Sequence, residues 1–325
     1  MKKIYLFFFS LLFLLLARPA FGTTVFSPLL EMSVDPGNSQ KGILKIYNET
    51  AAPITLTSSV EPFQAAGENG QPHYLAPSER DIYLKWFNIS SPTLVLLPRE
   101  AVLVPFAVTP PANAAPGGYY AVIFWQSNGT AGAPVSLSSK VGTLIFLTVN
   151  GVLKETGDVV DFSTTAKSDF IFSRPVNFIV RFSNSGNVHL APSGTIEVRS
   201  WFGRETVLPV NQEKKLILPD SRRRFDEVWH NLPPAANVWQ SFWQQTQAEF
   251  DEPAAGYYTA TLRLTYGSAK TQEVVKQIGF WVIPWHLILS FVVLAIIFLA
   301  LLKIRNKVNG FKKQKNNSAD VKKIK

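Results

Sequence analysis

The feature that most constrains this chain is an apolar run near its C-terminus. Residues 282–302 are apolar except for Pro284 and His286 near the start and Ser290 further on. The run is close to the ~20 residues that a helix needs to cross the hydrocarbon core of a bilayer. Because lipid offers no hydrogen-bond partners to the backbone, a single segment can cross it only as a helix. We therefore expect a transmembrane helix over 281–302.

The residues around this run predict its orientation. Trp281 and Trp285 lie at its N-terminal edge, where amphipathic rings favour the headgroup layer. The tail, residues 303–325, carries nine lysine and arginine residues opposed only by Asp320. Cationic segments stay on the cytoplasmic side, so we expect a cytoplasmic tail and an extracellular body. A solvated tail that only fixes orientation is the simpler interpretation of the lysines, and contact with anionic lipid is the alternative.

The N-terminus has the plan of a secretory signal. Lys2 and Lys3 precede an apolar run over residues 4–17, and small residues follow at Ala20 and Gly22. This pattern predicts a signal peptide over 1–22, cleaved before Thr23. An uncleaved anchor is the alternative, but the apolar run is short for one.

Charge and cysteine content exclude several classes of function. The formal net charge is +9, but nine of the 32 Lys and Arg residues lie in the tail and three in the signal, which leaves the body with 20 against 22 acids. The positive charge is therefore a topology signal, and we expect no nucleic-acid partner. The chain has no cysteine, so disulfides, thiol catalysis and cysteine-ligated zinc are excluded, and each domain needs its own apolar core.

The body, residues 23–279, predicts an all-β fold. Short apolar or alternating runs, such as 42–47, 101–108, 176–182 and 259–266, are separated by Pro, Gly, Asn and Asp. Short strands with regular turn signals are typical of antiparallel β-sandwiches.

An internal echo divides this body. A glycine turn and a tyrosine pair precede a strand at 116–120 and again at 253–258, and an asparagine turn follows an apolar strand at Asn48 and at Asn184. Two copies of one architecture explain the echo. The boundary is expected near Gly151 to Gly157.

The predicted fold class is therefore all-β, with two tandem immunoglobulin-like β-sandwich domains and one C-terminal transmembrane helix. The domains are expected at 23–153 and 154–280. Two stretches fit a sandwich poorly, the polar excursion 61–81 and the Gln- and Trp-rich segment 231–250, which has possible helical character. Functional loops and simple connectors both explain such insertions, and connectors are the simpler explanation.

The order of parts resembles the WxL-interacting surface proteins of bacteria. The residues that carry this resemblance are Phe26-Ser27-Pro28, Val34-Asp35-Pro36-Gly37 and the turn 116–120, together with a second β domain, a single span and a basic tail. The resemblance implies an immunoglobulin-like first domain that binds peptidoglycan and a second domain that binds host or partner proteins. Gly186-Asn187-Val188-His189 looks more like other bacterial immunoglobulin-type surface domains. The opening also resembles periplasmic pilus chaperones, which pair a strand with a client but are soluble.

No catalytic residue, metal site or cofactor is expected. Hydrolysis needs paired carboxylates, a nucleophile with a base, or a metal cluster. The four histidines, His73, His189, His230 and His286, are scattered without ligand spacing. Acidic residues pair only as sequence neighbours, at 226–227 and 251–252, where an extended strand directs the two side chains to opposite faces.

Two segments are candidates for ligand binding. Alignment of the echoed strands places Tyr120, Val122 and Phe124 inward, which predicts an outward face with Tyr119, Ile123 and Trp125. Such a face needs a cover. The chain's own excursion 61–81 or the second domain is the simpler cover, and a partner or wall polymer stacked on Tyr119 and Trp125 is the alternative.

The second candidate is the charge run Arg222, Arg223 and Arg224, which is suited to phosphate polymers or an acidic partner. A solvated loop before Phe225 is the simpler interpretation.

These features favour a membrane-anchored cell-surface protein that binds cell-wall polymer (peptidoglycan) or another surface protein. A structural or assembly scaffold, similar to a pilus chaperone, is the second hypothesis. A surface hydrolase has the least support.

Overall fold

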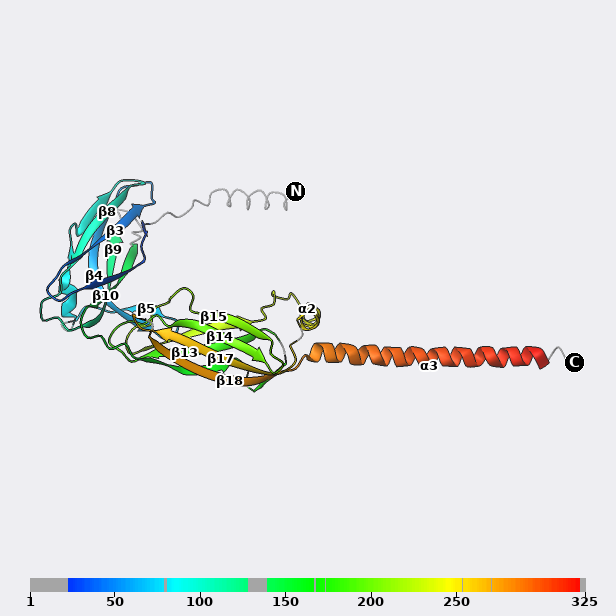
Figure 1. The fold of residues 1–325 in the computed structure, drawn as a ribbon. Helices are drawn as coiled ribbons and strands as arrows, with labels where there is room; N and C mark the ends of the chain where they lie inside the picture. Colours follow the sequence, from blue (N-terminus) through cyan, green and yellow to red (C-terminus); the bar gives the residue numbers. More distant parts are fainter. Residues whose placement is uncertain are drawn as a thin grey trace, which may run out of the picture. The chain divides into compact units, whose positions relative to one another are not determined.

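The computed structural model describes residues 23–321 except 79, 80, 128–138, 167, 173, 253 and 270, with side chains as far as Lys307. The predicted signal peptide lies outside the described residues. The described chain is mostly β and divides into two compact units (Figure 1). The first unit runs to Gly157 and includes the later segments Ser183–Leu190 and Leu216–Arg223, and the second unit holds the remainder.

The first unit is a sandwich of two sheets. One sheet has the strand order β1 (Thr23–Val25), β3 (Gln40–Asn48), β8 (Ala101–Val108) and β6 (Phe87–Ile89). The other has the order β2 (Leu29–Val34), β10 (Lys140–Val149), β9 (Gly117–Ser127), β4 (Ile54–Ala66) and β5 (Gln71–Tyr74). A further strand, β7 (Thr93–Leu96), pairs with β4, and a short 3-10 helix, η1 (Ile82–Trp86), precedes β6. All of these pairings are antiparallel except β2 with β10, which is parallel.

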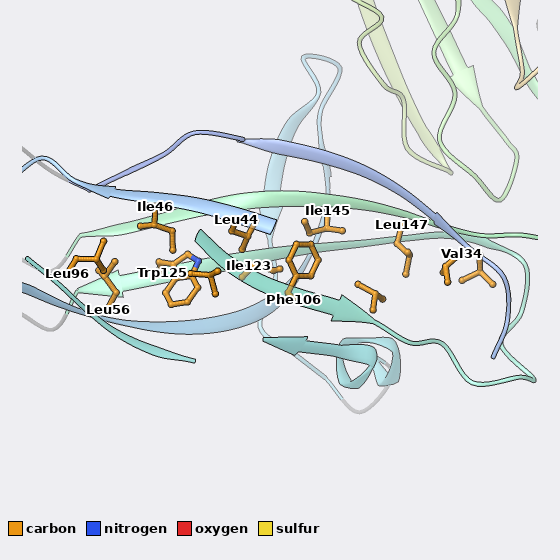
Figure 2. Packing of buried hydrophobic residues seen from close by; sticks show 13 residues of the cluster. Val34, Leu44, Ile46, Leu56, Leu96, Phe106, Ile123, Trp125, Ile145 and Leu147 are labelled. Atoms are coloured by element: carbon orange, nitrogen blue, oxygen red, sulfur yellow. The ribbon is translucent and has the colours of Figure 1, made fainter. Parts of the chain in front are cut away.

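The core of this unit lies between the two sheets. Leu44 and Ile46 on β3 are buried, whereas the alternate residues Ile43 and Lys45 are exposed, as expected for a strand with one face on the core. They meet Ile123, Trp125, Ile145 and Leu147 of the opposite sheet (Figure 2). The strand expected over 42–47 is therefore present, with one of its faces on the core.

Strand β9 is buried on both faces. Ile123 and Trp125 belong to the core between the sheets, whereas Tyr120, Val122 and Phe124 belong to a second apolar cluster. Phe63, Phe146 and Leu218 complete that second cluster. A continuous apolar run in the middle of a sheet is typical of a strand covered on both sides.

The excursion 61–81 is largely a β-hairpin, and the prediction of a loop or connector there is wrong. Strand β4 continues to Ala66 and pairs with β5 through a turn at 67–70. Gly67 and Gly70 in this turn have positive φ angles of 58° and 67°, which glycine adopts without strain. Tyr74 of β5 packs edge-on against Phe124, with ring centroids 4.9 Å apart. The hairpin therefore helps to cover the second face of β9.

The second unit is also built from two sheets. The smaller has the order β11 (Gly157–Thr164), β13 (Val176–Asn184) and β16 (Ser221–Trp229). The larger has the order β12 (Phe170–Ile171), β18 (Gln272–Val282), β17 (Gly256–Tyr266), β14 (Ser193–Ser200) and β15 (Glu205–Val210). Phe178 of β13 meets Phe280 of β18, and Phe182 meets Tyr266 of β17, with centroids 5.8 and 5.2 Å apart. These rings join the two sheets.

The two asparagines of the echoed turns make equivalent hydrogen bonds in the two halves of the chain. Asn48 ends β3 and Asn184 ends β13, and both are buried. Each side-chain oxygen accepts from the N–H two residues later, at Thr50 and at Gly186, over 2.9 Å in both cases. Each amide nitrogen donates to backbone carbonyls of a distant segment, at Leu97 and at Ile217. The repeated motif is therefore a buried asparagine turn that fixes the end of a strand.

The C-terminal part of the second unit contains two helices. Helix α2 (Val238–Asp251) confirms the helical character expected within 231–250. Helix α3 (Trp285–Val321) contains a segment, Trp285–Lys307, with mean hydropathy 3.0, long and apolar enough to cross a membrane. It begins later than the predicted span, because Trp281 and Val282 are still paired with Tyr257 and Gly256 in the sheet.

Candidate functional site

The predicted outward face of β9 is wrong. Ile123 and Trp125 have exposed fractions of 0% and lie between the sheets, beyond the reach of a ligand. Tyr119 is half-buried, and its ring packs 4.8 Å from Trp86, between centroids. The cover of this face is the opposite sheet of the same sandwich, not the excursion or the second half of the chain. On the echoed strand β17, the inward face predicted by the same alignment is correct, because Tyr258, Ala260 and Leu262 are buried.

The three arginines lie in β16 rather than in a loop, and their side chains do not act together. Arg222 is exposed. Arg223 donates to the Leu216 carbonyl over 2.8 Å. Arg224 forms a two-nitrogen contact with the Asp226 carboxylate at 2.8 and 2.6 Å. Two of the three guanidinium groups therefore already have partners, and a role for this run in ligand binding stays a prediction.

The structure instead places an open backbone edge at the start of β10. Strand β10 pairs with β9 along its whole length, but it pairs with β2 only from Leu144 onward. The chain between β1 and β2 crosses from one sheet to the other, and Pro28, which has no N–H to donate, immediately precedes β2. The segment Lys140–Gly142, hereafter the β10 edge, therefore has no strand on its outer side among the described residues.

The orientation of the backbone groups at this edge follows from the neighbouring hydrogen bonds. The Leu144 N–H donates toward the β2 side, to the Pro28 carbonyl at 2.8 Å, and the Ser139 carbonyl accepts from the Ser127 N–H on the β9 side. Successive residues of a strand direct their backbone groups to alternate sides. Lys140 and Gly142 therefore direct their N–H and C=O groups outward, in line with the Leu144 N–H.

The side chains leave this edge uncovered. The Lys140 ammonium lies 3.9 Å from the Phe124 ring centre and 2.7 Å from the Glu61 carboxylate, so it extends across the sheet toward β4. Gly142 has no side chain, and a Cβ there would lie 2.7 Å from atoms of Val122 and Phe124. Edge strands are commonly protected by an outward lysine, but here the lysine is turned away from the edge.

A second polar group of the first unit is His189. Its Nδ1 lies 3.3 Å from the Tyr120 hydroxyl and its Nε2 lies 3.7 Å from the Glu31 carboxylate. Burial lowers the pKa of His189 from its ordinary 6.5, and Glu31 partly opposes this shift. A neutral buried imidazole with one hydroxyl partner is a structural contact. Within the described ranges, no three His, Asp or Glu side chains are grouped to hold a metal ion.

Residues of α2 and of the first turn of α3 form a third polar group. The Glu249 carboxylate of α2 contacts His286 Nδ1 at 2.6 Å and accepts the Leu287 N–H at 2.9 Å, so it binds α2 to the first turn of α3. Glu249 and His286 are 3% and 5% exposed. The sequence gives no sign of this pair, because the two residues are far apart in the chain.

Comparisons with known proteins show a weak similarity to solved structures. No family model and no curated protein matches the sequence. Among solved structures, the chain is similar to the class 5 fimbriae chaperone CfaA, with a TM-score of 0.40 and 10% identity over 79% of this chain and 98% of that one. It is also similar to the E. coli chaperone DraB, with a TM-score of 0.34 and 13% identity over 80% and 98%.

A third similar structure is the Salmonella enterica SafB chaperone in complex with the SafA pilin. Its TM-score is 0.36 and its identity 10%, over 82% of this chain and 98% of that chain.

Proposed function

We propose that this protein is a membrane-anchored cell-surface protein that binds another protein, by accepting an extended segment of that partner along the β10 edge. Binding or assembly of a surface protein is the function, and the two sandwiches serve as immunoglobulin-like modules outside the membrane. The observation that carries the proposal is the pair of outward backbone groups at Lys140 and Gly142.

Unpaired strand backbone is a template for another strand. An added strand gains main-chain hydrogen bonds, and side chains of alternate residues provide specificity. At the β10 edge, a partner strand would continue the line of β2 and would lie beside Val141, which packs on the core between the sheets. Pilus assembly, in the manner of a periplasmic chaperone, is one form of this function.

The anchoring part of the proposal is supported by α3. Its apolar segment begins just after the sheet ends, and basic residues occur in its last part and beyond, from Lys303 onward. The orientation with the body outside follows from that charge.

A protein partner is favoured over a wall polymer because the β10 edge offers backbone hydrogen-bond groups in the geometry of a strand. The burial of Trp125 removes the stacking surface expected on β9, for a partner and for a wall polymer alike. Membership of the WxL-interacting proteins, with peptidoglycan as ligand, stays a prediction from sequence.

The test is a pair of substitutions at one position of the full-length protein. Lys140→Pro removes the outward N–H and is tolerated at the first residue of an edge strand, whereas Lys140→Ala removes the side chain but keeps the N–H. Cells are treated with a chemical crosslinker, and adducts of the anchored protein are identified by mass spectrometry.

The proposal predicts one protein adduct shared by the wild type and Lys140→Ala and lost in Lys140→Pro, with similar melting temperatures for all three. An adduct that survives in Lys140→Pro contradicts strand addition. Equal retention of all three proteins on isolated cell walls, without a protein adduct, favours the wall-polymer hypothesis instead.

A further inference from the structure

Helix α2 has the reverse of the usual amphipathic pattern. Its buried residues are polar, Gln245 and Glu249, whereas Trp239, Trp243 and Phe250 are exposed. Residues 239, 243 and 250 follow a spacing of four and seven, so they share one face of the helix. Trp239 and Trp243 have exposed fractions of 76% and 62%. In water, such an aromatic stripe is unfavourable, because it stays in contact with solvent while polar groups are buried.

The buried polar residues of α2 hold it at the start of α3. Besides the Glu249 contacts with His286 and Leu287, the Phe242 ring lies 6.2 Å from that of Trp285, between centroids. The Gln245 side chain exchanges two hydrogen bonds with the backbone of Arg174, at 3.1 and 2.5 Å. The Arg174 guanidinium donates to the Ala248 carbonyl at 2.8 Å and also to that of Glu252. The helix is thus fixed at the point where the apolar segment begins (Figure 1).

The neighbouring end of the second unit is also rich in exposed aromatic side chains. Tyr257 and Trp281 are opposite each other on β17 and β18, with ring centroids 5.5 Å apart. Trp201 follows β14, and its N–H donates to the Tyr257 carbonyl over 3.1 Å. Trp201, Tyr257 and Trp281 are all exposed, and they lie at the end of the sheet from which α3 leaves.

We infer that this end of the second unit, with α2 as its main contact, is seated in the outer headgroup layer of the bilayer that α3 crosses. The inference rests on the proposed anchoring by α3. Tryptophan and tyrosine favour the membrane interface because one part of the ring is apolar and the other is polar. A helix with an apolar face toward the acyl chains is the usual form of interfacial contact. The occupant is the lipid itself, because the stripe adjoins a segment that is apolar enough to enter lipid. The Phe242 ring lies 5.6 Å from that of Trp243 and 6.2 Å from that of Trp285, between centroids, and so links the two.

In this arrangement, the contact between Glu249 and His286 holds α2 beside the membrane-crossing helix. Their contact fixes α2 against the first turn of α3, so the second unit is held at the membrane by both helices rather than by α3 alone. The second unit then has a fixed orientation relative to the bilayer plane.

The test uses the absence of cysteine from the chain, which allows a single fluorescent label at a chosen position. Full-length variants Trp243→Cys, Leu294→Cys and Glu273→Cys are labelled and reconstituted into vesicles of phosphatidylethanolamine and phosphatidylglycerol. Glu273 lies on β18, eight residues before Trp281 and about 26 Å from it along the strand. Leu294 lies within the apolar segment. Quenching is measured with lipids that carry a spin label either near the headgroup or near the end of the acyl chain.

The inference predicts that the label at 243 is quenched several-fold more by the headgroup-proximal spin label than the label at 273, and that the label at 294 is quenched most by the deep one. If 294 is quenched by the deep spin label but 243 behaves like 273, the seating of α2 is contradicted while the anchor stands. If 294 is not quenched, the anchoring itself is wrong and the inference fails with it. Trp239→Cys repeats the measurement on the same helix face in case the label at 243 disturbs the fold.

Discussion

At the scale of single residues, the burial of Trp125 shows that this side chain of β9 belongs to the core and does not contact a ligand. Its side chain has no exposed surface, and its indole Nε1 finds no hydrogen-bond partner among the described residues. A buried donor without a partner costs free energy, so the contribution of Trp125 to stability comes from the volume that it fills.

We predict that Trp125→Ala lowers the free energy of unfolding by about 3–5 kcal/mol, because the cavity cannot be refilled by its neighbours. Urea denaturation of the full-length protein in detergent measures this change. Leu103→Ala, at an exposed apolar position of β8, is the control and is expected to change stability little. An unchanged denaturation midpoint for Trp125→Ala would contradict the placement of this ring.

The histidines make stability depend on pH. Because burial lowers the pKa of His189, a proton binds more readily to the unfolded chain than to the folded one. The corresponding stabilisation is present above the ordinary pKa of 6.5 and is lost as pH falls toward the lower pKa of the folded state. The pKa of His230 is lowered first by burial and then by the charge of Arg174, so it acts in the same direction.

We predict that the melting temperature falls as pH drops below about 6.5, and that this slope is smaller in His189→Gln and smallest in a double variant with His230→Gln. Thermal melts across that range measure the slope. A slope that is the same in all three proteins would show that other groups cause it.

At the scale of elements, the contact between α2 and α3 depends on one carboxylate. Removing Glu249 leaves the buried imidazole of His286 and the partly buried Leu287 N–H without their acceptor, at a cost of about 1–3 kcal/mol. This contact joins α2 to α3 only, so its loss is not expected to weaken the β-sheets.

We predict that Glu249→Ala increases hydrogen exchange across Val238–Asp251 while exchange in β17 and β18 stays the same. Asp251→Ala, which changes the other acid of the helix at an exposed position, is the control. Increased exchange in both variants would indicate that helix charge, not this contact, holds α2.

Elements also show what could be predicted from sequence. The apolar helix, the strands with alternating patterns such as β3, and the asparagine turns at Asn48 and Asn184 follow from local residue patterns. The two faces of β9 could not be told apart from the local pattern, because both are apolar and alternation carries no information in such a run. The signal that was available was the unbroken apolar sequence 121–125, which indicates a strand buried on both sides.

The open backbone at Lys140–Gly142 could not be predicted either. It exists because β2 begins one residue after Pro28 and so leaves the first part of β10 unpaired. This depends on the register between strands that are more than a hundred residues apart in the chain, which no local pattern specifies.

At the scale of the whole molecule, we propose an extracellular β-sandwich body that is fixed to a membrane and accepts a partner strand. The basic tail predicts that the C-terminal tail lies on the cytoplasmic side of the membrane and the body on the outer side. Protease added to intact cells, with access through the wall ensured, is expected to remove the body and leave 303–325 protected.

The most direct test of the central claim is a photo-reactive residue in place of Lys140 in the full-length protein, irradiated in intact cells. The account predicts an adduct with one surface protein, and mass spectrometry is expected to place the link in an extended segment of that protein. The same residue in place of Leu103, which is exposed on the outer face of the other sheet, is the control for non-specific contact. An adduct from 103 but none from 140, or equal adducts from both positions, would contradict binding at the β10 edge.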